Sequence, residues 1–432
     1  MNKKRKSPLW MLVPMGVIIV VLSIVLIVIT LKSGNQRIET ASALGTPGGE
    51  KEEESVDAAG SVQAEPEAAD TGPAQVYVSP DVPQKVKDKV KSMSLEEKAA
   101  QLFFVTPEAI TQVDAATVAG EDTKKAYEQY PVGGIIYFSR NIQGPDQLKE
   151  MLSKTQNYAK EIAGVPVFLG VDEEGGEVSR VAGNKNFSVT RYESMRAIGD
   201  SRDTSQAYDV GKNLASYLKE IGFNIDFAPD ADVLTNPQNE VVKKRSFGSD
   251  AELVSRMSMA VVKGLEEHGI YATLKHYPGH GATLSDSHKG YAYTDKTLEE
   301  LMEEELIPFK EGISEDIHFI MVAHISVPEI TKDTVPCSLS PYMVTDVLRE
   351  QLGYQGIVIT DAMNMGAISQ EYNSKEASVM ALKAGVDLVL MPTDFEEAYQ
   401  GVLSAIEEGE LTEERIDESV RRVLRLKNDK NF

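Results

Sequence analysis

Short apolar runs alternate with longer segments of helical periodicity along this chain, and this alternation limits its possible folds more than any other feature. Eight runs follow one another: LFFV (102–105), GGIIYF (133–138), VFLGV (167–171), IDFAP (225–229), ATLKH (272–276), FIMVAH (319–324), IVIT (357–360) and DLVLM (387–391). Runs this short, apolar on both faces, are typical of buried parallel strands. The segments between them, such as 146–163, carry apolar residues at helical spacing. Eight alternations favour an α/β fold with a single (β/α)8 TIM-like barrel over an open doubly wound sheet.

Two helices are predicted in more detail. The stretch SLEE at 94–97 fits a capping box, because the Ser94 hydroxyl and the Glu97 carboxylate can each accept a hydrogen bond from the other's main-chain N–H. The stretch LTEERIDESVRRVLRLK at 411–427 predicts an amphipathic helix. Its apolar face contains Ile416, Val420, Val423 and Leu424.

Charged or histidine side chains close or directly follow five of the eight apolar runs. They are Asp172, Glu173 and Glu174; Asp230 and Asp232; Lys275 and His276; His324; and Asp361. In a parallel barrel the carboxyl ends of all strands share one face, where active sites lie. Asp361 alone could equally be the N-cap of a helix, but five strands that end in this way predict an active site on that face.

The residue types at these positions suit the hydrolysis of a glycosidic bond, which needs a nucleophile and a group that exchanges a proton. Asp361 is the best candidate nucleophile, because it directly follows an apolar strand. Asp286 lies two residues before His288, and a turn at this spacing can bring the carboxylate against the imidazole. The carboxylate would fix the tautomer and raise the basicity of the ring, so this pair can serve as the acid/base.

A zinc site and a purely structural loop remain alternative interpretations of the stretch KHYPGHGATLSDSH at 275–288. His276, His280, His288 and Asp286 are possible ligands, but Pro278 and the glycines indicate a loop instead of the helical pair of histidines found in zinc peptidases. The hydrolytic interpretation is favoured, and His280 is the histidine expected to hold the loop structurally.

The N-terminus predicts where the barrel is located. The basic residues 1–8 precede an uncharged apolar stretch, 9–31, which is long enough to span a hydrocarbon core of about 30 Å. We interpret 9–31 as a transmembrane anchor instead of a cleaved signal peptide, whose apolar region is about 7 to 15 residues long. Residues 32–84 are rich in Ala, Gly, Pro, Ser and acidic residues and predict a disordered linker. By the positive-inside rule, residues 1–8 are cytoplasmic and the barrel, 85–432, is extracellular on a single-pass anchor.

The charge and cysteine content exclude some partners and bonds. The formal net charge of −23 argues against nucleic acid, whose binding requires an excess of Lys and Arg. The single cysteine, Cys337, cannot form an internal disulfide bond. The sequence makes no prediction of the oligomeric state.

Seven segments together resemble glycoside hydrolase family 3, and within it the short β-N-acetylhexosaminidases of the bacterial NagZ type. They are MSLEEKAAQLF, GVDEEGGEVSR, NIDFAPDADVLTNP, KRSFGSD, KHYPGHGATLSDSH, CSLSPYMVTDVLREQLGYQGIVITDAMNMGAI and AGVDLVLMP, in family order from about residue 85 onward. The resemblance implies a retaining β-N-acetylglucosaminidase in which Asp361 forms a glycosyl-enzyme intermediate and His288, oriented by Asp286, is the acid/base.

The resemblance also implies which residues bind the terminal sugar: Asp172, Arg180, Arg245, Lys275 and His276. No metal or organic cofactor is expected. The expected substrates are peptidoglycan-derived or other oligosaccharides that end in N-acetylglucosamine. Three alternatives remain: a family 3 β-glycosidase of another sugar preference, a phosphorylase of β-linked N-acetylglucosamine, and a non-catalytic sugar-binding protein of the envelope. The intact Asp361, Asp286 and His288 argue against the last of these.

Overall fold

The computed structural model describes residues 82–283 and 286–428, which belong to one compact unit of the chain. The predicted basic segment (1–8), the predicted transmembrane anchor (9–31) and the predicted linker up to residue 81 lie outside the described residues. Within the described residues, no helix is both long and apolar enough to cross a bilayer.

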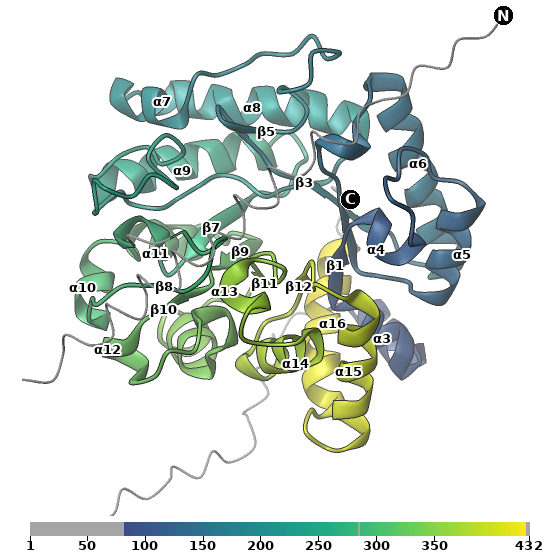
Figure 1. Cartoon of the computed structure of the whole chain (residues 1–432). Helices are drawn as coiled ribbons and strands as arrows, with labels where there is room; N and C mark the ends of the chain where they lie inside the picture. The colour runs from purple at the N-terminus through teal and green to yellow at the C-terminus, as the bar shows by residue number, and fades with distance from the viewer. Residues whose placement is uncertain (1–81, 284–285, 429–432) are drawn as a thin grey trace, which may run out of the picture. The chain divides into compact units, whose positions relative to one another are not determined.

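Eight parallel strands form the centre of this unit (Figure 1). They are β1 (Phe103–Val105), β2 (Gly134–Ile136), β3 (Phe168–Val171), β6 (Ile225–Asp226), β7 (Thr273–Tyr277), β9 (Phe319–Val322), β11 (Ile357–Thr360) and β12 (Val389–Leu390). Hydrogen bonds link β12, β1, β2, β3 and β6 in that order, and β7, β9 and β11 in that order. Isolated bridges join the two sheets at both edges: Ile225 to Tyr271 and Asp230 to Lys275 at one edge, and Ile359 to Leu388 at the other. The strands therefore close into a barrel, and the predicted fold is confirmed: each apolar run contains one strand.

Helices surround the barrel and connect its strands (Figure 1). The α-helices are α2 (Gln84–Ser92), α3 (Leu95–Gln101), α4 (Pro107–Thr111), α5 (Glu121–Gln129), α6 (Pro145–Ile162), α7 (Met195–Ser201), α8 (Thr204–Ile221), α9 (Ala251–Glu266), α10 (Leu298–Glu303), α11 (Ile307–Ser314), α12 (Pro328–Thr331), α13 (Gly366–Ser369), α14 (Ser374–Ala384), α15 (Phe395–Glu407) and α16 (Glu413–Lys427). Short 3₁₀ segments are η2 (Ser139–Asn141), η3 (His280–Ala282) and η4 (Cys337–Leu339), and η5 (Tyr342–Gln351) is a π-helix. Two small additions lie outside the barrel ladder: the antiparallel pair β4 (Glu173–Gly175) and β5 (Val178–Ser179), and the parallel pair β8 (Ala292–Tyr293) and β10 (Ile325–Ser326).

Side-chain caps determine where several of these helices begin. At α3, the Ser94 hydroxyl accepts a hydrogen bond from Glu97 N at 3.2 Å, and the Glu97 carboxylate accepts one from Ser94 N at 2.8 Å. The predicted capping box is therefore confirmed. Asp250 caps α9 by accepting a hydrogen bond from Leu253 N at 3.2 Å, which satisfies a main-chain donor that the helix itself leaves open.

The interior of the barrel is filled by side chains and is a packed core. The rings of Phe104 and Phe227 meet edge to face with centroids 5.1 Å apart, and Phe168 meets Phe319 in the same way at 5.4 Å. Gly134 is required at its position, because a Cβ atom there would lie 2.3 Å from the Phe104 ring. A glycine in β2 thus makes room for the aromatic ring that β1 contributes to the interior.

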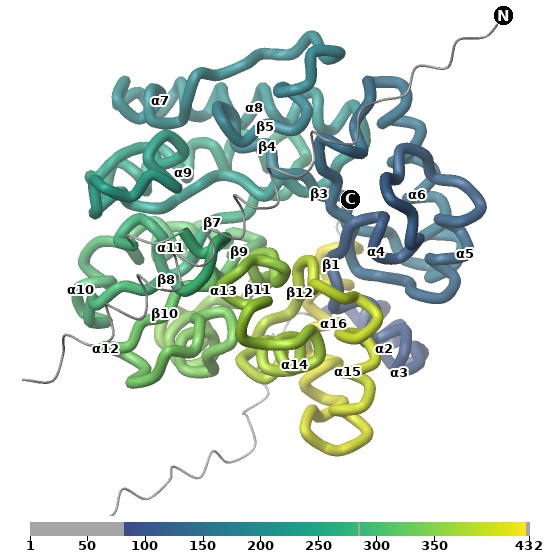
Figure 2. The backbone as a smooth tube through the Cα atoms, viewed as in Figure 1, coloured from purple at the N-terminus to yellow at the C-terminus, as the bar shows by residue number. Residues whose placement is uncertain are grey.

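Helix α16 closes the amino-terminal end of the barrel. Its predicted apolar residues, Ile416, Val420, Val423 and Leu424, are all fully buried. Val423 packs within the same cluster as the barrel-interior residues, and the Lys427 ammonium lies 5.0 Å from the ring centroid of Phe168, the first residue of β3. In Figure 2 this helix is the yellow segment near α2 and α3, which it contacts. A site for a substrate must therefore lie at the carboxyl end.

Candidate active site

An open cavity of about 750 Å³ lies at the carboxyl ends of the barrel strands. It is lined by residues that follow β3, β7 and β11, together with residues from the long connections. The structure brings together in this one cavity every site residue predicted from the sequence: Asp172, Arg180, Arg245, Lys275, His276, Asp286, His288 and Asp361.

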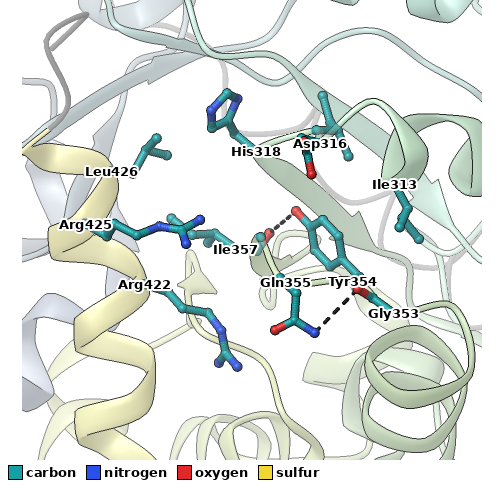
Figure 3. Close-up of a pocket in the computed structure, with 12 residues that line it drawn as sticks. Ile313, Asp316, His318, Gly353, Tyr354, Gln355, Ile357, Arg422, Arg425 and Leu426 are labelled. Carbon is teal, nitrogen blue, oxygen red and sulfur yellow. Dashed lines mark hydrogen bonds between the residues drawn. The ribbon is translucent and has the colours of Figure 1, made fainter. Parts of the chain in front are cut away.

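A second cavity, of about 320 Å³, lies at the other end of the barrel and has a different character. It is lined by His318, just before β9, by Ile357 at the start of β11 and by Arg422 of α16. Figure 3 shows Arg422 and Arg425 on one side of it and Tyr354 across from them. Arg422 is held by Asp387 at 3.0 Å, and His318 Nδ1 lies 2.8 Å from Glu266. None of the predicted site residues lines this cavity.

Asp361 directly follows β11 and is held at two points. Its N–H donates to the carbonyl of Val322 in β9 at 2.9 Å, and its carboxylate Oδ1 accepts from the N–H of Ala362 at 2.8 Å. Burial opposes ionisation of this carboxyl, but His276, His324 and the Ala362 N–H outweigh it and lower the pKa of Asp361 to about 2. Asp361 is therefore a carboxylate at neutral pH, which is the state that a nucleophile needs.

His324, one of the residues that the sequence placed at strand ends, lies behind the nucleophile and is not among the residues that line the cavity. Its Nε2 lies 3.1 Å from the carbonyl of Ala362, and its Nδ1 lies 2.7 Å from the Ser338 hydroxyl. Because a carbonyl only accepts, Nε2 carries the proton and Nδ1 accepts from Ser338. Burial lowers the pKa of His324, so the neutral ring fixes the segment that follows Asp361.

Asp286 and His288 form the pair that their spacing predicted. The carboxylate Oδ1 of Asp286 lies 3.0 Å from both the main-chain N and the ring Nδ1 of His288. Burial opposes ionisation, but hydrogen bonds from His288 and Lys289 lower the pKa of Asp286. The carboxylate accepts from Nδ1–H, which leaves Nε2 of His288 as the nitrogen that can exchange a proton. The His288 side chain is 61% exposed, so this nitrogen is open to the cavity and to water.

The segment that contains this pair, which we call the His288 loop (residues 286–290), is docked on α13, just after the nucleophile. The N–H of Gly366 donates to the carbonyl of His288 at 3.2 Å, and that of Ala367 donates to the carbonyl of Ser287 at 3.0 Å. The Gln370 amide donates to the carbonyl of Lys289 at 3.1 Å. Three hydrogen bonds thus fix the acid/base candidate relative to the nucleophile candidate.

His280 anchors the other side of the same loop. Its N–H donates to Asp232 Oδ1 at 2.6 Å, while its ring nitrogens lie 3.1 Å from the Thr283 hydroxyl and 2.9 Å from the Ser287 hydroxyl. Burial lowers the pKa of His280 to about 4, so the ring is neutral near pH 7. These contacts agree with the structural role predicted for His280.

The predicted sugar-binding residues form an alternating network of charges. The Lys275 ammonium lies 3.1 Å from Asp172 and 2.6 Å from Glu174. Arg245 binds both carboxylate oxygens of Glu174, each at 2.8 Å, and Arg180 lies 3.6 Å from Asp172. Burial opposes ionisation of Glu174, but Arg245 and Lys275 hold its pKa well below the usual range. The network fixes cationic donors and anionic acceptors at the wall of the cavity.

His276 connects this network to a buried aspartate. Its Nδ1 lies 2.7 Å from Asp232 Oδ2, and its Nε2 lies 3.2 Å from the Arg245 guanidinium. Because a guanidinium only donates, Nε2 must accept and Nδ1 must carry the proton that Asp232 accepts. Asp232 and Glu174 are residues that the sequence placed at strand ends without assigning them to the site.

His276 and the aspartates next to it are also residue types that can bind a metal ion. Within residues 82–283 and 286–428, the candidate ligand group is Asp230, Asp232 and His276, whose ligand atoms lie within 4.8 Å of one another. Arg245 already lies against this group, with Nε 3.4 Å from Asp230 Oδ2 and a terminal nitrogen 3.2 Å from His276 Nε2. A metal ion would therefore have to displace the guanidinium. The zinc set considered from the sequence, which included His280 and His288, is not the set that the described residues bring together.

Comparisons with known proteins agree with this geometry. A family model described as "Glycosyl hydrolase family 3 N terminal domain" matches residues 94–426. The chain is 33% identical over 334 residues to "Beta-hexosaminidase A" of Pseudoalteromonas piscicida, covering 72% of this chain and 56% of that relative. It is 33% identical over 348 residues to "Beta-hexosaminidase LpqI" of Mycobacterium tuberculosis, covering 78% of this chain and 83% of that one.

Solved structures give the same result. A glycoside hydrolase family 3 beta-N-acetylglucosaminidase from Paenibacillus sp. str. FPU-7 matches with a TM-score of 0.73 at 36% identity, over 78% of this chain and 64% of that one. The chain therefore spans less than two thirds of some of its relatives, including the Pseudoalteromonas protein. The closed barrel, the match over residues 94–426 and relatives at this level of identity together confirm the family prediction: the chain belongs to glycosyl hydrolase family 3.

Proposed function

We propose that this chain is an exo-acting, retaining β-N-acetylglucosaminidase that removes terminal β-linked N-acetylglucosamine from peptidoglycan-derived or related oligosaccharides. The observation that carries this proposal is the pairing, in one cavity, of an ionised carboxylate, Asp361, with an imidazole held by a carboxylate, His288 with Asp286. The names of the relatives, beta-hexosaminidase and beta-N-acetylglucosaminidase, support the choice of sugar.

The proposed reaction has two steps. In the first, Asp361 forms a bond to the anomeric carbon while the bond to the leaving oxygen breaks, and His288 Nε2–H gives its proton to that oxygen. Asp286 stabilises the ring while it is positively charged. In the second step, neutral Nε2 takes a proton from water, whose oxygen attacks the anomeric carbon and releases Asp361.

The charged network supplies the contacts to the sugar. Arg180, Arg245 and Lys275 donate to hydroxyl groups or to the acetamido carbonyl, and Asp172 accepts from hydroxyl groups. Their positions are fixed before the sugar binds, because Lys275 and Arg245 are already held by buried Glu174. Because these side chains are already ordered in the free protein, the entropic cost of binding the sugar is lower.

We also propose that residues 9–31 anchor the protein in the cell membrane and that residues 32–84 tether the barrel outside it. This part of the proposal rests on the sequence alone. Protease treatment of intact cells tests it, because an extracellular barrel is cleaved and a barrel on the cytoplasmic side is protected.

The activity is tested on the full chain with an aryl β-N-acetylglucosaminide and an aryl β-glucoside, each with and without phosphate. Preferential turnover of the first substrate, independent of phosphate, supports the proposal, and Asp361→Asn should abolish it. Equal inertness of the wild type and Asp361→Asn on all β-N-acetylglucosaminides would remove the enzymatic interpretation. Activity that survives exhaustive chelation separates this mechanism from a zinc-dependent one.

A further inference from the structure

Two tyrosines close to the His288 loop lie side by side on the surface. Tyr291 is 49% exposed and Tyr293 is 43% exposed. Their rings are stacked, with centroids 5.4 Å apart and planes inclined by 19°. We propose that Tyr291 and Tyr293 form a platform that binds the sugar ring on the leaving-group side of the scissile bond, so that the preferred substrate is an oligosaccharide. This inference rests on the proposed function and specifies its substrate.

The local strand explains why the two rings share one face. Tyr293 lies in β8, and successive side chains along a strand point to opposite faces, so residues 291 and 293 point the same way. Ala292 between them is fully buried. The tyrosine rings are therefore exposed to water, while buried Ala292 holds the strand against the protein.

The platform is located at the same end of the barrel as the active site. Strand β8 pairs in parallel with β10, with Ala292 opposite Ile325 and Tyr293 opposite Ser326, and the two strands lie together in Figure 1. Ile325 directly follows His324, which lies at the carboxyl end of β9 and bonds the segment after the nucleophile. The pairing thus places β8 beside the carboxyl end of the barrel.

The position of Tyr291 in the sequence, close to His288, indicates which side of the scissile bond the platform contacts. Tyr291 lies three residues after His288, so their Cα atoms are at most about 11 Å apart. The acid/base must contact the glycosidic oxygen, so the leaving sugar extends toward the His288 side of the cavity. The first or second leaving-group ring is therefore the part of the substrate that can extend to the tyrosines.

The chemistry of a β-linked sugar matches this surface. The axial C–H bonds of a β-linked pyranose form an apolar face that packs against an aromatic ring, while the tyrosine hydroxyls remain free to bond sugar hydroxyls. Lys289, which lines the cavity between His288 and the platform, adds a donor to the same side. Neither tyrosine lines the cavity itself, so the platform would extend the cavity past Lys289.

The experiment uses the full chain and two substrates. Methyl β-N-acetylglucosaminide has no second ring, whereas the β-1,4-linked trisaccharide of N-acetylglucosamine has two rings on the leaving-group side. In the double variant Tyr291→Ala/Tyr293→Ala we expect KM for the trisaccharide to rise about fivefold to tenfold. Values of kcat/KM for the methyl glycoside should stay within about twofold. The variants Tyr291→Phe and Tyr293→Phe should retain most of the affinity, and Tyr342→Ala, another exposed tyrosine, is the matched control.

Calorimetric titration of the trisaccharide into Asp361→Asn, with and without Tyr291→Ala/Tyr293→Ala, measures binding without turnover. A Kd that is about fivefold to tenfold weaker with the tyrosine substitutions supports the platform even if the wild type hydrolyses neither substrate, a result that would contradict only the proposed function. An unchanged Kd and KM, equal losses on both substrates, or no binding of the trisaccharide to Asp361→Asn with both tyrosines intact would overturn the platform.

Discussion

Replacing Gly366 with alanine tests how the acid/base candidate is held. Gly366 begins α13, and a Cβ atom at this position would lie 2.9 Å from the carbonyl oxygen of His288, 2.9 Å from Lys289 C and 2.8 Å from the Gln370 amide. Side-chain carbons do not approach main-chain atoms this closely. The substitution must therefore push the His288 loop away from the nucleophile segment, although it replaces none of the predicted catalytic residues.

The contacts give the expected magnitude. The displacement breaks the hydrogen bond from Gly366 N to the His288 carbonyl and that from the Gln370 amide to the Lys289 carbonyl, at 3.2 and 3.1 Å in the docked state. Each contributes about 1 kcal/mol net, so the docked loop loses about 2 kcal/mol relative to undocked arrangements. Since 1.4 kcal/mol corresponds to a factor of ten, we expect the rate of the protonation-dependent step to fall about thirtyfold.

The assay compares two leaving groups. The sugar leaving group of a disaccharide needs protonation, whereas 2,4-dinitrophenolate departs without it. Gly366→Ala should therefore lower kcat/KM, which reports the first step, strongly on the disaccharide and only slightly on the dinitrophenyl glycoside. Gly144→Ala is the matched control, because a Cβ atom at Gly144 has open space around it. Equal losses on both substrates, or no loss on either, would refute the argument that this contact positions the proton donor.

Three further predictions concern polar groups in and next to the cavity. Burial lowers the pKa of His280 to about 4 against about 6.5 when unfolded, so on acidification the unfolded state takes up a proton first and the folded protein loses stability. Between pH 7.5 and 5 the loss is about 2 kcal/mol, and urea unfolding of His280→Gln should not show this component. Arg245→Met removes a cation that contacts the buried carboxylates of Glu174 and Asp230, and it should lower the free energy of unfolding by about 3 to 5 kcal/mol. Lys244→Met is the control: Lys244 forms an exposed pair with Glu177, so the free energy of unfolding should stay unchanged. Asp286→Asn should lower kcat on a disaccharide about a hundredfold without a change in the urea midpoint, because the neutral amide no longer stabilises the protonated ring.

The barrel could be predicted because its signal is local and repeated. A strand buried on both faces must be apolar along its whole length, and each of the eight runs contains one strand of the observed ring. Closure of the ring is different, because it requires the first strand to pair with the last, as Phe103 does with Val389, and no local pattern in the sequence indicates that pairing. The pairing of β8 with β10 also gives no such signal, since each is a two-residue strand.

The candidate site was predictable where its partners are close in sequence. Asp286 and His288 are two residues apart, and a turn alone can join them. Arg245 and Glu174 are 71 residues apart, and His276 and Asp232 are 44 apart, so only the folded barrel brings these groups together. The sequence did indicate that Glu174 and Asp232 lie near the site, because both follow apolar runs. It could not indicate that they are buried or which residues they contact, because both depend on the fold.

The charges of the cavity favour water over phosphate as the acceptor in the second step. Six carboxylates line it against four cations: Asp172, Glu174, Glu177, Glu240, Asp286 and Asp361 against Arg180, Arg245, Lys275 and Lys289. Arg245 and Lys275 are already held by buried Glu174, and Lys289 lies 3.3 Å from Asp286. Arg180 lies 3.6 Å from Asp172. Each of the four cations therefore already faces a carboxylate, and a phosphate dianion would have to compete with these carboxylates on its way to Asp361, in a chain whose net charge is −23. Water and a neutral sugar carry no such cost, and on this ground hydrolysis is the better match to the cavity than phosphorolysis.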